Sequence, residues 1–393
     1  MKSNWITATI DDVCTVVTDG AHNSPKSVEQ GHYMASVKDF TEFGFDFSNC
    51  KQIGEEDYEK LRNQGCVPEK NDILVGKDGA RYFEDIIIYK QDERPALLSS
   101  IAILRADCRK ITPEFLYYTL KSPAVRKDVR DNYGSGSAIP RIVLKDFKRM
   151  PFSFPSIEEQ RKITNLCSAI DAKIQINNAI NENLLQQAQA LYKDRFVDLK
   201  PFDGEMPPDW RLGTVSEIIE LHDSKRIPLS SRERANLAKI YPYYGATSVM
   251  DYVDRYLFDG IYLLLGEDGT VVDSKGFPIL QYVEGKFWVN NHAHIITGKN
   301  GFTVETLYLL FSLTNVQSIV TGAVQPKISQ GNLNKVSVVI PSEAELSAFN
   351  SIVQPIFAQI RNLRAENDRL AATRDTLLPR LMSGELDVSS LDI

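Results

Sequence analysis

The chain has 393 residues, of which 43% are hydrophobic and 25% charged, so it is long enough for two or more domains with cores of their own. No apolar run approaches the roughly 18 residues that a membrane span needs. The five cysteines are dispersed without a C-x-x-C pair, which argues against disulfides and structural zinc and favours reduced thiols in the cytoplasm.

The net charge of −7 argues, taken alone, against nucleic acid as a partner. The charge is uneven, however, because residues 105–149 carry eleven Lys and Arg against five Asp and Glu. A basic stretch on an acidic chain is compatible with a surface that faces phosphates. Ordinary solvated helix faces would give the same count, so the charge pattern leaves both interpretations open.

The first part of the chain predicts an α+β domain. Short apolar runs of strand length alternate with Gly, Asp and Pro, and the sequence Gly-Lys-Asp-Gly is typical of a tight turn after a buried strand. In chain order the elements are an entry at Trp5, the apolar run 73–75, the turn 76–79, strands at 85–89 and 99–104, a helix at 112–117, and Pro-Arg-Ile at 140–142.

Two long helices are the clearest local signal. The S-x-x-E patterns at 156–159 and 342–345 are typical of helix starts. Apolar residues then recur at alternating spacings of three and four, which predicts a coiled coil. Each half of the chain leads into its own helix, so we expect the two helices to run antiparallel. Asn181 and Asn367 occupy equivalent seam positions, and we expect them to approach each other and fix the register.

Residues 136–196 align without a gap onto residues 322–382, at a constant offset of 186. The upstream elements recur in the same order, with Trp210, a Gly-Glu-Asp-Gly turn at 266–269 and a helix at 303–308. A repeat of this length indicates two half-molecules in one chain. The predicted fold class is therefore α+β, with two similar globular domains separated by a long two-helix antiparallel coiled coil in a pseudo-twofold arrangement.

No catalytic constellation is recognisable in the sequence. There is neither a G-x-x-x-x-G-K-[ST] phosphate loop nor the Asn/Asp-Pro-Pro-aromatic motif of an amino-methyltransferase. His292 and His294 offer two ligand-type side chains without a clear third, and Asp268 with Asp273 and Lys275 only faintly resembles a nuclease core. We therefore predict no catalytic residue, no metal site and no cofactor in this chain.

The chain resembles the specificity (S) subunits of type I restriction–modification systems over essentially its whole length. The resemblance is carried by Pro-Ser-Ile-Glu-Glu-Gln-Arg-Lys-Ile at 155–163, its duplicate from Pro341, and Leu-Leu-Pro-Arg-Leu-Met-Ser-Gly-Glu-Leu at 377–386. The repeated order of turn, short helix and Pro-Arg/Lys-Ile adds to it. One departure is Leu346, which stands where the first half has Gln160.

The resemblance implies a non-catalytic specificity subunit that reads a bipartite site in double-stranded DNA, with one half-site per target-recognition domain. It also implies two docked methyltransferase (M) subunits, further restriction (R) subunits, and S-adenosylmethionine, ATP and Mg²⁺ on those partners. The implied limits are 1–155 and 199–341 for the two target-recognition domains, 156–198 and 342–383 for the coiled-coil helices, and 384–393 for the tail.

Residues on the two turns and in the segments that follow the glycine-rich loops are candidates for contacting DNA, because Arg and Lys anchor phosphates or read guanine and Asp accepts from cytosine. An ordinary surface turn residue is the alternative for each. Two rival functions stay open: a coiled-coil structural adaptor for protein partners without DNA readout, and a self-contained nuclease or methyltransferase. The candidates are Lys77, Asp78, Arg81, Ser137, Arg141 and Lys145 in the first domain, and Tyr243, Tyr244, Asp268 and Lys327 in the second.

Overall fold

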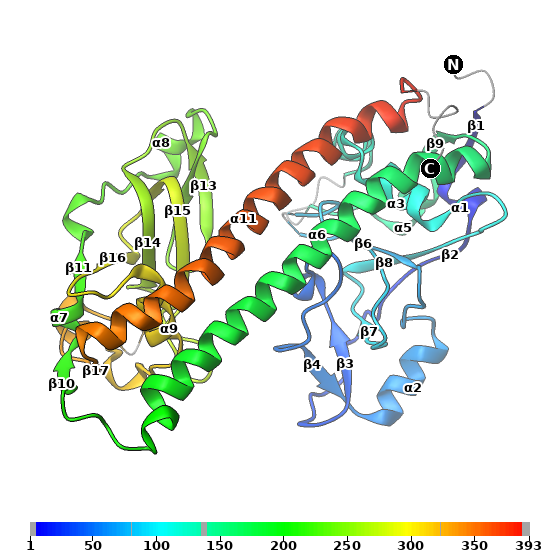
Figure 1. Ribbon diagram of the computed structural model, residues 1–393. Coiled ribbons are helices and arrows are strands. Elements are labelled where there is room, and N and C mark those ends of the chain that lie inside the picture. Colours follow the sequence, from blue (N-terminus) through cyan, green and yellow to red (C-terminus); the bar gives the residue numbers. More distant parts are fainter. Residues whose placement is uncertain (1–4, 80, 135–139, 323, 387–393) are drawn as a thin grey trace. The chain divides into compact units, whose positions relative to one another are not determined.

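The structure is a computed structural model that describes residues 5–79, 81–134, 140–322 and 324–386. The chain divides into two compact units (Figure 1). Unit 1 comprises residues 1–177 and 366–393, and unit 2 comprises residues 178–365. Within the described ranges, no helix is both long enough and apolar enough to cross a membrane.

Unit 1 is built on a four-stranded sheet of order β2–β8–β5–β6, a three-stranded sheet of order β4–β3–β7 and a ribbon of β1 and β9. Strand β5 is apolar throughout because both of its faces are covered. Ile73 and Val75 pack with Phe115 of helix α3, whereas Leu74 packs in a second cluster with Tyr89. The elements are β1 (Ile6–Thr9), α1 (Ile10–Val13), β2 (Cys14–Asp19), β3 (His32–Ala35), β4 (Lys51–Ile53), α2 (Glu55–Asn63), β5 (Ile73–Gly76), β6 (Ile86–Ile88), β7 (Ala96–Leu97), β8 (Ile101–Ala106), α3 (Pro113–Lys121), α4 (Pro123–Asp128), α5 (Leu144–Arg149) and β9 (Pro151–Phe154).

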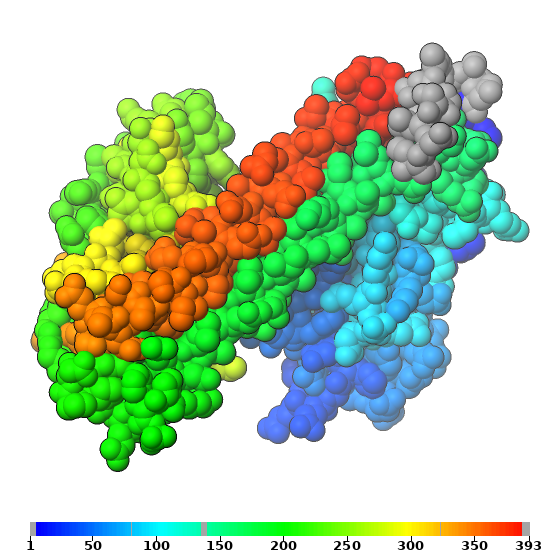
Figure 2. All heavy atoms as spheres, viewed as in Figure 1, coloured from blue at the N-terminus to red at the C-terminus, as the bar shows by residue number. Residues whose placement is uncertain are grey.

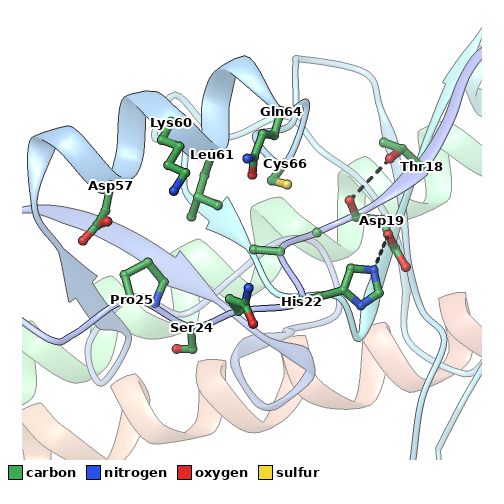
Figure 3. Close-up of a pocket in the computed structure, with 13 residues that line it drawn as sticks. Thr18, Asp19, His22, Ser24, Pro25, Asp57, Lys60, Leu61, Gln64 and Cys66 are labelled. Atoms are coloured by element: carbon green, nitrogen blue, oxygen red, sulfur yellow. Dashed lines mark hydrogen bonds and ion pairs between the residues drawn. The ribbon is translucent and has the colours of Figure 1, made fainter.

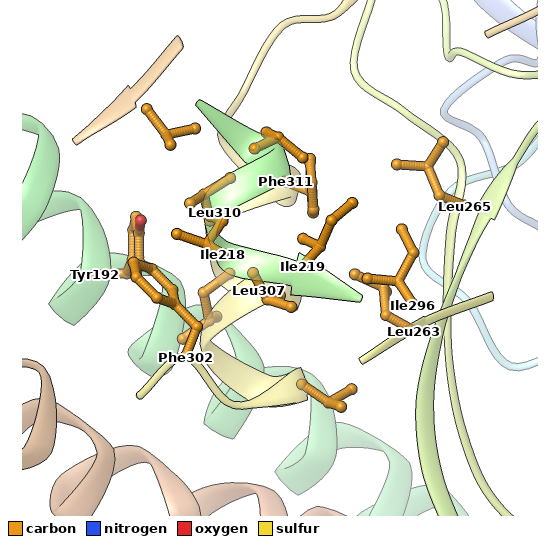
Figure 4. Packing of buried hydrophobic residues seen from close by; sticks show 14 of the residues in the cluster. Tyr192, Ile218, Ile219, Leu263, Leu265, Ile296, Phe302, Leu307, Leu310 and Phe311 are labelled. Carbon is orange, nitrogen blue, oxygen red and sulfur yellow. The ribbon is translucent and has the colours of Figure 1, made fainter. Parts of the chain in front are cut away.

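Unit 2 is built on a six-stranded sheet of order β11–β16–β14–β15–β12–β13 and a ribbon of β10 and β17. Strand β14 again has both faces covered. Leu263 and Leu265 lie in the core cluster with Leu307 of helix α9 (Figure 4), and Leu264 packs in another cluster with Phe287. The elements are β10 (Arg211–Thr214), α7 (Val215–Ile218), β11 (Ile219–Leu221), α8 (Ser231–Ala235), β12 (Tyr241–Tyr244), β13 (Val249–Val253), β14 (Phe258–Gly266), β15 (Leu280–Val289), β16 (Ala293–Gly298), α9 (Val304–Ser312), α10 (Gln330–Leu333) and β17 (Ser337–Ile340).

The short helices α3 and α9 begin in the same way in both units. The Thr112 hydroxyl accepts a hydrogen bond from the amide of Phe115, and the Thr303 hydroxyl accepts one from Thr306. Each bond satisfies an amide that has no partner within the helix, so the threonine sets where the helix starts. The helices predicted at 112–117 and 303–308 are therefore present.

The two predicted long helices are α6 (Ile157–Tyr192) and α11 (Glu343–Met382), and each runs through both units. In unit 1, Asp171 contacts Arg374 and Asn177 contacts Asn367, so residue numbers rise along one helix while they fall along the other. In unit 2, the Tyr192 ring lies 5.7 Å from that of Phe349. Figure 2 shows the side chains of α6 and α11 lying against one another. The prediction of an antiparallel pair is confirmed.

The seam of unit 1 contains the asparagine that the sequence singled out, but with a different partner. Asn177 donates from Nδ2 to Oδ1 of Asn367 at 2.8 Å, and also to Oε2 of Glu366 at 2.8 Å. Asn181 belongs to unit 2, so its approach to Asn367 stays a prediction.

Candidate nucleic-acid interface

In unit 1, the predicted turn and the predicted Pro-Arg-Ile segment are joined by backbone hydrogen bonds. The amide of Gly79 donates to the carbonyl of Pro140 at 2.9 Å, and the amide of Ile142 donates to the carbonyl of Lys77 at 3.0 Å. Asp78 and Arg141 face each other in an antiparallel bridge between these bonds. Residues that lie more than 60 positions apart in the chain therefore form one small surface.

Unit 2 repeats this arrangement with different side chains. The amide of Gly269 donates to the carbonyl of Pro326 at 3.0 Å, the amide of Ile328 donates to the carbonyl of Glu267 at 2.9 Å, and Asp268 bridges to Lys327. We call this pair of backbone-bonded segments the clasp: residues 76–79 with 140–142 in unit 1, and residues 266–269 with 326–328 in unit 2.

A glycine is required at the same point of each clasp. Gly79 has φ +99° and Gly269 has φ +91°, values that residues with a Cβ rarely adopt. Each of these glycines also donates the amide that ties the turn to the second segment. The Gly-x-Asp-Gly repeat in the sequence therefore encodes a backbone geometry that both units need.

The side chains on the clasps combine cations with carboxylates. Arg141 is exposed, and Lys327 is half exposed with its Nζ 3.3 Å from Oε1 of Glu267. Asp268 accepts a hydrogen bond from Gln325, and the Nδ1 atom of His292 lies 3.7 Å from Oδ2 of Asp268. These groups can meet phosphates and base edges.

A hollow of about 520 Å³ opens beside the clasp of unit 1. Its lining includes Asp78 and Arg81, and Lys38 contributes a third charged side chain. Arg81 is held by Asp85, to which its Nη2 atom donates at 2.8 Å. Of the predicted residues, Asp78, Arg81 and Arg141 are therefore gathered at one accessible place, and Lys145 lies exposed on α5.

Two predicted residues lie below the surface. Tyr243 is 1% exposed, its hydroxyl accepts from the amide of Leu229, and the Arg234 guanidinium covers its ring at 4.7 Å. The prediction of a direct DNA contact is therefore wrong for Tyr243. Lys77 is also buried, where it is paired with Asp19 at 3.4 Å, so it supports the turn from beneath.

The two remaining predicted residues have different outcomes. Tyr244 is half-buried at the end of β12, with its ring 5.8 Å from that of Phe287. Ser137 lies outside the described residues.

Beneath the clasp of unit 2 lies a buried group of charges that the sequence analysis missed. Asp223 accepts hydrogen bonds from the amide of Ile295 at 2.9 Å and from Nε2 of Gln330 at 2.6 Å, and its Oδ2 atom lies 2.6 Å from Nδ1 of His294. Burial would raise the pKa of Asp223, but these hydrogen bonds outweigh it, and the pKa is lowered. A signal was present, because each unit has an aspartate at the end of its second strand: Asp19 is the last residue of β2, and Asp223 lies two residues after β11.

Asp223, Glu267 and His294 place three ligand-type atoms within 4.8 Å of one another. Their charges already have protein partners, however. Arg226 donates from Nη1 to Oε2 of Glu267 at 2.5 Å, and Nε2 of His294 lies 2.8 Å from the carbonyl of Ile328. A carboxylate group balanced by an arginine and an imidazole is typical of an internal ion network and fits poorly with a divalent cation.

A second cavity, of about 480 Å³, lies in unit 1 between helix α2 and the segment after β2 (Figure 3). It is lined by polar groups such as His22, Lys60 and Gln64. Asp19 belongs both to this lining and to the ion pair under the clasp. The sequence does not predict this cavity, because its walls come from segments without a recognisable motif.

Two α+β units that carry the same backbone clasp define a duplicated protein with two equivalent surfaces. Residues 2–186 and 207–371 match the family described as "Type I restriction modification DNA specificity domain". The chain belongs to this family, and the predicted resemblance is confirmed. It is a specificity subunit in kind, and not one of the catalytic subunits.

Individual relatives agree with the family. The type I restriction enzyme MjaIX specificity subunit of Methanocaldococcus jannaschii is 26% identical over 309 residues, which cover 72% of this chain and 71% of that protein. The MjaVIII specificity subunit of the same organism is 22% identical over 372 residues, covering 85% and 83%. An adaptor without DNA readout and a self-contained nuclease or methyltransferase are not favoured, because these relatives are named as specificity subunits.

The fold also has a solved counterpart. The crystal structure of the S subunit of a type I restriction–modification system from M. genitalium superposes with a TM-score of 0.51 over 96% of both chains, at 18% sequence identity. This likeness confirms the predicted fold class.

Proposed function

We propose that this chain is the DNA-specificity subunit of a type I restriction–modification complex and that the surface around each clasp reads one half of a bipartite site. The observation that carries the proposal is that both units build the same backbone clasp from sequence-distant segments, in a chain of the DNA specificity family. Two equivalent surfaces in one chain suit a target with two parts.

The clasp is suited to reading because its backbone is constant while its side chains differ. Unit 1 presents Asp78 and Arg141, and unit 2 presents Asp268 and Lys327. Arginine can bond two acceptors of guanine in a fork, whereas lysine supplies a single strongly hydrated charge. The two half-sites are therefore expected to differ in sequence.

The wider assembly follows from the same proposal. Two methyltransferase subunits dock on the chain and supply the S-adenosylmethionine chemistry, and restriction subunits bring ATP and Mg²⁺. The five free cysteines suit the cytoplasm, where host DNA is also found.

The proposal is tested with the chain co-expressed with its methyltransferase subunits. Arg141→Ala and Lys327→Ala should each weaken binding to a duplex that carries the site found by mapping methylated bases. A lost phosphate contact lowers the slope of log affinity against log salt by about 1, and a lost base contact costs about 1–3 kcal/mol at one half-site. Lys335→Ala, an exposed lysine before β17, is the charge-matched control and should bind as wild type. Unchanged affinity of both clasp variants at moderate salt would contradict the proposal.

A further inference from the structure

His294 occupies a buried position directly beneath the clasp of unit 2. It is fully buried on β16, and both of its ring nitrogens have partners. Nδ1 lies 2.6 Å from Oδ2 of Asp223, and Nε2 lies 2.8 Å from the carbonyl oxygen of Ile328, a clasp residue. His294 therefore links the segment that follows β11, where Asp223 lies, to the clasp through one side chain.

The partners determine which atoms of the ring carry protons. A carbonyl oxygen only accepts, so Nε2 of His294 must be the donor to Ile328. Asp223 also accepts from Ile295 and Gln330, so the carboxylate is bonded on three sides when His294 is counted. His294 thus ties a buried carboxylate to a clasp carbonyl through the two nitrogens of one ring.

The surrounding charged side chains form one network with His294. Glu267 lies 3.7 Å from Nδ1 of His294 through its Oε2 atom, and it is paired in turn with Arg226 at 2.5 Å and with Lys327 at 3.3 Å. Arg226 also lies 3.6 Å from Asp223. The clasp residue Lys327 is therefore positioned partly by the same network that contains His294.

In unit 1, different residues surround the largely buried aspartate beneath the clasp. Val75 pairs with Ala102 as Leu265 pairs with His294, so Ala102 stands in the place of the histidine. Lys77 of the Gly-Lys-Asp-Gly turn stands where unit 2 has Glu267, and it pairs directly with Asp19 at 3.4 Å. The side chain that pairs with the largely buried aspartate thus comes from the turn in unit 1 and from the neighbouring strand in unit 2.

The residue three positions after each aspartate completes the correspondence. His22 lies 3.4 Å from Asp19 in unit 1, and Arg226 lies near Asp223 in unit 2. Each unit therefore has its own set of three residues around one aspartate. Both aspartates are largely buried, so neither set is an ordinary surface cluster. The sets are His22, Lys77 and Ala102 in unit 1, and Arg226, Glu267 and His294 in unit 2.

We propose that His294 is a positioning residue for DNA readout by unit 2: by bonding Asp223 and Ile328 at once, it holds the clasp in the conformation that presents Asp268 and Lys327 to the bases. This inference depends on the proposed function of the clasps. Lys77 has the corresponding role in unit 1. The two roles are separable by mutation, because each residue supports the clasp of its own unit.

The experiment uses the full chain co-expressed with its methyltransferase subunits, acting on a plasmid library with randomised inserts. Mapping the methylated inserts by single-molecule sequencing gives the base preferences of both half-sites. His294→Ala should lower discrimination at one half-site by about tenfold or more and leave the other unchanged. Lys77→Met should do the same at the opposite half-site. Lys335→Ala is the control and should preserve both.

A rescue variant separates positioning from general loss of folding. Arg226→His, Glu267→Lys and His294→Ala together install the unit 1 set in unit 2, and this triple variant should regain discrimination at the affected half-site. If His294→Ala does not fold, the triple variant decides: a folded triple variant that has lost one half-site overturns the inference. So does a His294→Ala complex that reads both half-sites as wild type does. A wild-type complex that shows no bipartite preference would instead contradict the proposed function itself.

Discussion

The ion pair between Asp171 and Arg374 joins α6 to α11 inside unit 1, and its removal should destabilise that unit strongly. Arg374 donates from Nη1 to Oδ1 of Asp171 at 2.6 Å, and the Tyr118 hydroxyl donates to Oδ2 of Asp171, also at 2.6 Å. Asp171 is 5% exposed and Arg374 is 7% exposed. Burial alone would lower the pKa of Arg374, but the hydrogen bonds to Asp171 and Asp375 outweigh it, and the pKa is raised.

The expected magnitude follows from what each substitution leaves behind. Arg374→Met removes the cation and leaves the carboxylate of Asp171 buried beside the Tyr118 hydroxyl, which should cost about 3–5 kcal/mol of unfolding free energy. Domains of this size have about 5–15 kcal/mol in total. The loss is therefore a large fraction of the stability of unit 1.

The chain itself provides the apolar alternative. At the repeat offset of 186, Asp171 corresponds to Phe357 and Arg374 to Ala188, and both of these residues lie in the hydrophobic core of unit 2. Tyr118 corresponds to Leu309 of the aligned short helices. The combination of Asp171→Phe, Arg374→Ala and Tyr118→Leu should thus cost no more than about 1 kcal/mol, because no buried charge is left without a partner.

The assay is hydrogen exchange of the full chain in increasing urea, read by mass spectrometry on peptides from each unit. Peptides of α3 report unit 1, and peptides of α9 serve as the internal control from unit 2. The single variant should lower the urea midpoint of the α3 peptides only. A loss below about 1 kcal/mol for Arg374→Met, or an equal loss for the triple variant, would refute the reasoning.

Two further predictions concern the clasps and unit 2. Gly79→Ala and Gly269→Ala should each cost about 1–2 kcal/mol through left-handed backbone strain and weaken one half-site in the methylation assay, whereas Gly204→Ala, with φ +83° outside the clasps, should show the strain without the loss of readout. The hydrogen bond from Lys239 helps lower the pKa of Asp251 to about 2, so its contribution to stability is present above its unfolded pKa of about 4 and is lost as the pH falls towards 2. Asp251→Asn should therefore flatten the decline of the urea midpoint of unit 2 between pH 5 and pH 2.5, and an unchanged slope would contradict this assignment.

The elements that the sequence predicted well are those whose signal is local or repeated. The capping threonines Thr112 and Thr303, the S-x-x-E starts and the apolar 3–4 spacing each act within a few residues of the chain. The constant offset of 186 then indicated that whatever forms in one half forms in the other. The same logic found the turn of each clasp, although not its bonding to the second segment, because Gly79 and Gly269 mark a backbone conformation that few residues allow.

The burial of individual side chains and the contacts between distant segments could not be predicted from such local or repeated patterns. Tyr243 looked like an aromatic beside a DNA-facing surface, but β12 joins the sheet between β15 and β13 and turns this side chain into the core. His294 was noted only beside His292, two positions earlier. Its partner Asp223 is 71 residues away and arrives through the pairing of β11 with β16, which no local pattern reveals.

The difference between the two buried charge sets limits how the halves of this chain can diverge. Lys77→Glu alone would place a third carboxylate beside Asp19 and Asp78 in a largely buried site and would remove the lysine that pairs with both. It should therefore cost about 3–5 kcal/mol in unit 1. Adding Ala102→His and His22→Arg supplies the imidazole and the guanidinium that accompany the aspartate in unit 2, and it should recover most of that loss.

Urea unfolding of the single and the combined variant, followed on α3 peptides, measures this directly. If Lys77→Glu alone is tolerated, the charge beneath the clasp does not constrain the turn, and the two units could exchange turn residues freely. If only the combined variant is stable, the reading surface and its buried support must change together. New half-site preferences would then arise most readily from exposed clasp positions such as Arg141, whereas a change at Lys327 would also affect its buried partner Glu267.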